Sequence, residues 1–184
     1  RERAATGETA RTGVTGNVLV VSYFFPPAGN VGVHRTLRFI KWLPKFGWQP
    51  IVLTAANAKV PDLDTSLLKK IAGNVPVYRS GSFEAFNQGK PIDAPPESLA
   101  KPSTRSKLRK LADGLLCDFW RYVSIPDEKR GWVRHAIREG EKIIERHAVD
   151  AIYVSGKPFS SYLIGEALSR RFGIPWIMDL RDLW

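Results

Sequence analysis

The sequence has little of what disulfide frameworks and metal sites require. Its 184 residues include one cysteine, Cys117, and three histidines, His34, His135 and His147, which lie far apart along the chain. One cysteine excludes an intrachain disulfide and a cysteine-rich zinc site, and it favours a reducing, cytoplasmic setting. Because the histidines are scattered, we also expect no histidine metal cluster.

Long apolar runs are missing as well. The longest, at 18–28, is interrupted by Ser22 and by two prolines, whereas a helix that spans a membrane needs roughly 20 apolar residues. The first sixteen residues are small and polar and lack the apolar stretch of a signal peptide, so we expect 1–16 to be a flexible leader. The chain stops at Trp184 directly after an apolar, strand-like run, and we expect it to be a fragment of a longer protein.

Acidic residues are outnumbered. Asp and Glu total 18 against 28 Lys and Arg, which gives a formal net charge of +10. Such an excess points to an anionic partner, namely a nucleic acid, a phosphorylated small molecule or an acidic membrane surface. Nucleic acid has the least support, because the chain has no zinc finger and no aromatic–basic RNA motif, and 127–146 interleaves basic with acidic residues. We therefore expect no nucleic-acid partner.

What is present is an alternation of apolar runs and amphipathic segments. Continuous β-branched runs are typical of strands buried on both faces of a parallel sheet, and helical spacing of apolar residues separates them. Strands are predicted at 17–25, 50–54, 75–80, 150–155 and 175–180, and helices at 33–46, 67–71, 104–123, 127–147 and 159–172. This order predicts an α/β domain over 17–184 with a doubly wound parallel sheet. Prolines and glycines at about 81–106 predict a mobile excursion.

Three loops are candidates for a ligand site, because ligands of open parallel sheets bind beyond the carboxyl ends of the strands. The loops that follow strands there are 26–35, 155–160 and 179–184. In the first, Gly29, Asn30 and Gly32 precede a helix whose free amides would favour phosphate, and a plain glycine turn is the alternative. The second opens with Ser155 and carries Lys157 without P-loop spacing. Lys157 either meets a phosphate or is solvated.

The third loop places charges at the end of an otherwise apolar strand. Asp179, Arg181 and Asp182 stand within four residues of one another. Alternation along the strand puts Asp179 and Arg181 on the same face, and charges in such a place need a partner or a ligand. Two interpretations remain open: a structural Asp–Arg pair, or a substrate site at the rim of the cleft.

Taken together, these loops resemble a known family. The order PPAGNVGVHR, FGWQPIVLT, IPDEKRGWVRHAIREG, DAIYVSGKPFSSYLIG and GIPWIMDLRDLW is similar to the N-terminal domain of the family-four glycosyltransferases, over 17–184. Members are retaining enzymes made of two Rossmann-like domains, the GT-B architecture. The N-terminal domain binds the acceptor, and the C-terminal domain, absent here, holds the nucleotide-sugar donor. The resemblance implies a glycan or lipid-linked acceptor in polysaccharide or glycolipid synthesis, no cofactor bound by this domain, and no activity of this domain alone.

The resemblance also implies roles for individual residues. In the family the glycine loop closes over the donor diphosphate, which implies binding of substrate or phosphate by Gly29, Asn30, Gly32 and Arg35. Asp179 and Asp182 would bind or position acceptor hydroxyls, and Arg181 would stabilise charge. The chain departs from the family in lacking a histidine after the fifth strand and in having Leu183 in place of proline. A different class, a non-catalytic nucleotide- or phosphate-binding α/β module, is the alternative.

Much of the positive charge lies in one segment. Between Lys101 and Lys110 there are five basic residues and no acid, and the helix predicted next has an apolar stripe. Such a helix suits an anionic membrane surface. The residues expected there are Lys107, Arg109, Lys110 and Trp120, which would make the protein cytoplasmic and peripheral on the inner face of the membrane. The alternative is a stripe that packs on the sheet beside solvated basic residues.

Overall fold

A computed structural model gives the fold and describes residues 16–56, 58, 60, 62–71, 73–82 and 125–181. Within these ranges one sheet has the order β3-β2-β1-β4-β5, and every neighbouring pair is parallel. Its strands are β1 (Gly16–Val21), β2 (Trp48–Ala55), β3 (Val77–Ser80), β4 (Ala151–Ser155) and β5 (Trp176–Asp179). The predicted class, an α/β domain with a Rossmann-like doubly wound sheet, is confirmed.

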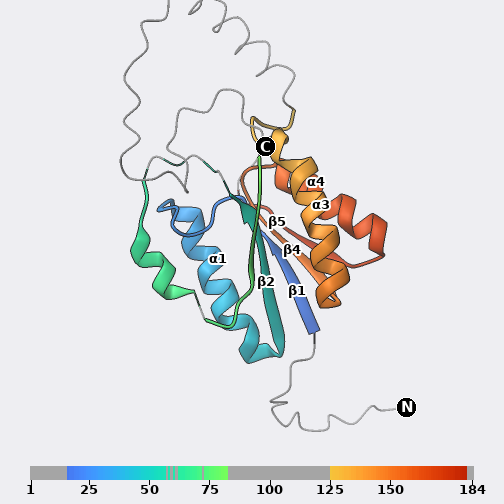
Figure 1. Cartoon of the computed structure of the whole chain (residues 1–184), viewed down its shortest axis with the longest axis horizontal. Coiled ribbons are helices and arrows are strands. Elements are labelled where there is room, and N and C mark those ends of the chain that lie inside the picture. Colours follow the sequence, from blue (N-terminus) through green and yellow to red (C-terminus); the bar gives the residue numbers. More distant parts are fainter. Residues whose placement is uncertain are drawn as a thin grey trace, which may run out of the picture.

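Helices cover both faces of the sheet. They are α1 (Val31–Trp42), which continues into a 3₁₀ turn at Leu43–Phe46, a 3₁₀ helix at Thr65–Lys70, α3 (Arg130–His147) and α4 (Ser160–Phe172). Figure 1 shows α1 on one side and α3 with α4 on the other. Successive residues of β1 alternate between two cores: Leu19 and Val21 pack under α3 and α4, while Val18 and Val20 pack under α1. β1 is therefore buried on both faces, as its continuous apolar run predicts.

The face predicted for α3 is also confirmed. Trp132, Ala136, Gly140 and Ile143 are all buried and follow one another at helical spacing. Gly140 permits close packing of α4, since a Cβ there would lie 2.6 Å from Cδ1 of Leu168.

The first strand and the first helix end earlier than predicted. β1 stops at Val21, because the chain turns at Ser22, whose hydroxyl donates to the carbonyl of Phe24 at 2.9 Å. The helix predicted at 33–46 begins at Val31 and changes to a 3₁₀ turn at Leu43, where Pro44 has no N–H to continue the α-helical ladder. As a result Phe46 is 73% exposed and does not join the core.

The start of α3 was predicted at Asp127 and lies at Arg130, with Lys129 as its N-cap. Asp127 instead serves the other helix: its carboxylate accepts from the backbone N–H of Ser160 at 2.8 Å and from the Ser160 hydroxyl at 2.6 Å. It also accepts from the Lys129 N–H at 2.9 Å. Asp127 therefore caps α4 and fixes the entrance of α3 beside it.

Several predictions fall on residues outside the described ranges. These are the leader at 1–15, most of the excursion at 81–106, and the helix at 104–123. Gly16, the last residue predicted for the leader, belongs to β1 and pairs with Trp48. Lys107, Arg109, Lys110 and Trp120 lie there too. In the part of the chain that is described, no helix combines the length and apolar character needed to cross a membrane.

Candidate functional site

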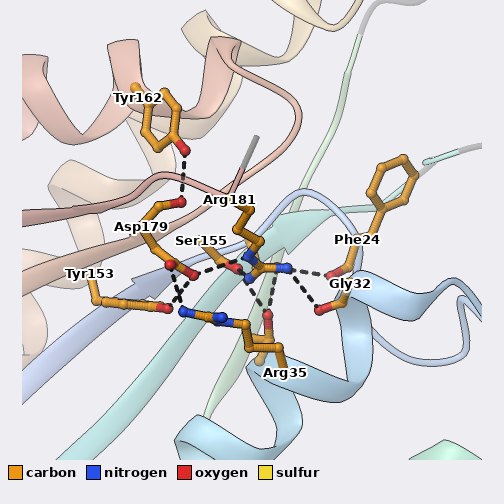
Figure 2. A network of polar contacts seen from close by, with 10 residues as sticks. Phe24, Gly32, Arg35, Tyr153, Ser155, Tyr162, Asp179 and Arg181 are labelled. Atoms are coloured by element: carbon orange, nitrogen blue, oxygen red, sulfur yellow. Dashed lines mark hydrogen bonds and ion pairs between the residues drawn. The ribbon is translucent and has the colours of Figure 1, made fainter. Parts of the chain in front are cut away.

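The site lies at the carboxyl edge of the sheet, where the strand order reverses. β1 has β2 on one side and β4 on the other, so the switch point falls between β1 and β4. Polar side chains from α1, β4, α4 and the end of β5 meet there, together with the main-chain carbonyl of Gly32 (Figure 2). We call them the Asp179 cluster, which comprises Gly32, Arg35, Tyr153, Ser155, Tyr162, Asp179 and Arg181.

Asp179 is the centre of the cluster. One carboxylate oxygen accepts from Nη2 of Arg35 at 2.8 Å, and the other accepts from the Tyr153 hydroxyl at 2.7 Å and from Nε of Arg181 at 3.0 Å. The Tyr162 hydroxyl donates to the main-chain carbonyl of Asp179 at 2.8 Å. With only 9% of its side chain exposed, Asp179 is a largely buried anion that is compensated by two arginines.

The surroundings decide the protonation of this centre. Burial raises the pKa of the Asp179 carboxyl, but the hydrogen bonds from Tyr153 and Arg181 and the charges of Arg181 and Arg35 outweigh it, so this pKa lies below its usual value. Burial, followed by the bond to Asp179, raises the pKa of Tyr153 to about 12. At neutral pH Asp179 is thus a carboxylate and Tyr153 a hydroxyl donor, an arrangement suited to orienting arginines rather than to moving protons.

The two arginines differ in their freedom. Arg181 is 19% exposed, and its guanidinium also donates to the Ser155 hydroxyl and, at 3.4 Å, to the carbonyl of Gly32. Arg35 keeps 61% of its side chain exposed. Arg181 is therefore held in place on several sides, while Arg35 presents much of its guanidinium to solvent, where an anion can reach it.

Behind Arg181 runs a chain of buried hydroxyls that was not predicted from the sequence. Ser155 Oγ lies 3.2 Å from Thr36 Oγ1, which lies 3.3 Å from Ser22 Oγ. All three residues are buried. The sequence did carry a signal, because helical spacing puts Thr36 on the apolar face of α1 with Val33 and Ile40, where a polar group requires a partner.

Replacing Thr36 by valine should lower the free energy of unfolding by about 1–2 kcal/mol, because two buried hydroxyls lose a shared partner. Urea denaturation of the variant and of the unchanged chain measures this difference. Thr65→Val is the matched control, since Thr65 is exposed and its replacement should change stability by less than about 0.5 kcal/mol. Equal losses in the two variants would show that the hydroxyl chain contributes nothing.

The glycine loop differs in part from the prediction. The N–H of Gly29 is not free for a phosphate, because it donates to the carbonyl of Asp62 at 3.0 Å. Asn30 is extended, with φ −74° and ψ 153°, and begins α1 without a side-chain cap. Among the described residues its buried Oδ1 has no hydrogen-bond partner. Gly32 and Arg35, by contrast, both belong to the Asp179 cluster.

The remaining predicted site residues lie elsewhere. Lys157 follows β4 by two residues and lines a separate hollow of about 450 Å³ beside the cluster. Asp182 lies outside the described ranges. Asp179 and Arg181 do form the pair that one of the two interpretations of the sequence expected, and the structure adds Arg35 and Tyr153 to it.

Fold and site thus define an α/β protein with a charged cluster at the switch point of a doubly wound sheet. No protein-family model matches this chain, and no curated protein matches it. A solved structure that resembles it is the C-terminal domain of the PF1911 hydrogenase from Pyrococcus furiosus, at a TM-score of 0.45 and 14% identity, over 90% of this chain and 91% of that one. A likeness of this size carries no argument about function.

Proposed function

We propose that this chain is the N-terminal, acceptor-binding domain of a retaining two-domain glycosyltransferase and that the Asp179 cluster borders its active-site cleft. The observation that supports the proposal most is the meeting of the loops after β1, β4 and β5, the segments that carry the family resemblance. Arg35 and Asp179, 144 residues apart in sequence, form an ion pair of 2.8 Å at this point. The switch point is where ligands of such sheets bind.

The cluster suits the charge that sugar transfer creates. When a nucleotide-sugar donor loses its sugar, negative charge develops on the leaving diphosphate, and positioned cations stabilise it most in the transition state. Arg35 is exposed enough to reach such a group, and Arg181 adds a second positive charge beside it. Asp179 holds both guanidinium groups in place, and Asp182 is proposed to bind acceptor hydroxyls.

Location follows from the same proposal. We propose that this transferase acts on lipid-linked acceptors in the cytoplasm, at the inner face of the membrane. The basic segment with Lys107, Arg109 and Lys110 would hold it there by attraction to anionic lipid.

A transfer assay tests the proposal. The protein as its gene encodes it is incubated with a panel of nucleotide sugars and sugar acceptors, and the products are examined by NMR. We expect transfer with retention of anomeric configuration. Binding of nucleotides without transfer from any donor would overturn the proposal in favour of a non-catalytic nucleotide-binding module.

A further inference from the structure

A hollow lies beside the Asp179 cluster at this edge of the sheet. It has a volume of about 450 Å³, within the range of small-molecule sites. Phe24, which follows β1, forms one wall, and the loop from Lys157 to Phe159, which follows β4, forms another. In Figure 2 the ring of Phe24 points away from the Asp179 cluster. The hollow thus lies next to the cluster and is lined in part by two phenylalanines.

The helix that begins at this hollow is not an anion site. The first N–H of α4, that of Ser160, already donates to the Asp127 carboxylate at 2.8 Å, and the next two, of Ser161 and Tyr162, donate to the carbonyls of Pro158 and Phe159 at 3.0 Å each. A carboxylate of the protein thus occupies the position at which a phosphate would meet the helix dipole.

Among the described residues of the lining the charges also balance. Asp127 and Glu128 contribute two negative charges, and Lys129 and Lys157 contribute two positive ones. A phosphate would gain from the lysines and lose to the carboxylates. An uncharged polyol meets no such conflict, because both signs of side chain hydrogen-bond to hydroxyl groups, and the C–H face of a sugar ring packs on aromatic rings.

We propose that this hollow binds an uncharged sugar ring of the acceptor, packed against Phe24 and Phe159, with its hydroxyls toward Glu128 and Lys157. This inference rests on the proposed function. It specifies that the part of the acceptor bound at this subsite is a neutral glycosyl residue. The net charge of the chain, +10, would by itself have suggested an anionic ligand.

Titration of the full chain with methyl glycosides of glucose, galactose, mannose and N-acetylglucosamine, followed by NMR of the backbone amides, tests the inference. At least one glycoside should shift the amides of Lys157 and Phe159. Glucose 6-phosphate should bind no more tightly than methyl glucoside. Tighter binding of the phosphate that Lys157→Ala removes would overturn the inference, as would a lack of response to all four glycosides.

A leucine scan localises the site. Phe24→Leu keeps apolar volume but removes the ring, so affinity for the bound glycoside should fall about fivefold. Phe46→Leu is the matched control, because Phe46 is 73% exposed beyond the far end of α1, away from the hollow, and its replacement should leave affinity unchanged. Equal affinities of the two variants would place the sugar elsewhere.

The two proposals fail in different ways. Glycoside binding that depends on Phe24, without transfer from any donor, would remove the transferase and leave the sugar site. Transfer with an acceptor KM that Phe24→Leu does not change would keep the transferase and remove this subsite.

Discussion

Replacing Asp179 by asparagine should reduce sugar transfer by about a hundredfold or more and lower the free energy of unfolding by about 2–3 kcal/mol. The amide keeps the shape of the carboxylate but not its charge. Arg181, with only 19% of its side chain exposed, would lose its ionic partner, and Arg35 would lose the contact that orients its guanidinium. Transfer assays and urea denaturation of the variant measure the two effects.

The same substitution should change how stability depends on pH. Because the pKa of Asp179 is lowered in the folded chain, its contribution to stability is fully present above the usual carboxyl pKa of about 3.9 and is lost as the pH falls through the lower folded value. Asp179→Asn should remove this acid-dependent loss. Glu166→Gln, in an exposed pair with Arg170, is the control and should change stability by less than about 0.5 kcal/mol. Near-normal transfer with an unaltered pH profile would contradict the role given to Asp179.

Replacing Gly156 by alanine should destabilise the chain by about 2–3 kcal/mol and abolish transfer. A Cβ at this buried position would lie 2.8 Å from the carbonyl oxygen of Asp179 and 3.0 Å from Cγ of Arg181. The backbone oxygen cannot move without shifting the end of β5. The φ angle of Gly156 is not positive, so alanine can adopt the same backbone conformation. The loss of stability then measures the steric contact of the Cβ and not backbone strain.

Gly73→Ala is the matched control for that substitution, because no heavy atom of the described residues, apart from the chain neighbours, lies within 4 Å of the position that a Cβ would take there. At such a site alanine is neutral or stabilises by up to about 1 kcal/mol, through the unfolded state. Urea denaturation of both variants, with transfer assays, compares them directly. Equal stability of the two would show that the end of β5 tolerates displacement and that Gly156 is not a spacer for the cluster.

The fold could be predicted from the sequence because each buried strand is a continuous apolar run and the runs alternate with helical patterns. The same signal placed the end of β1 too late. Tyr23 and Phe25 are fully buried although they lie in a loop. Hydrophobicity reports burial, and a buried loop that follows a buried strand has the same composition as more strand.

The site could be predicted only where its contacts are local. Alternation along β5 was sufficient to put Asp179 and Arg181, two residues apart, on the same face, where the structure pairs them. The partner Arg35 is 144 residues away, and only the strand order brings it near. The sequence also left the N–H of Gly29 available for a phosphate, whereas in the structure it donates to the carbonyl of Asp62. Asp62 lies in a later loop that has no sequence pattern from which this contact could be predicted.

The carboxylate of Asp127 has a consequence for how a ligand would enter the hollow. Its bonds to Ser160 cross 33 residues of sequence and tie together two of the loops that line the hollow. Loops joined in this way have little conformational entropy left to lose, so association costs less than it would for free segments. We therefore expect the hollow to be preorganised, so that a sugar would bind with little change in the backbone of 126–129 and 157–160.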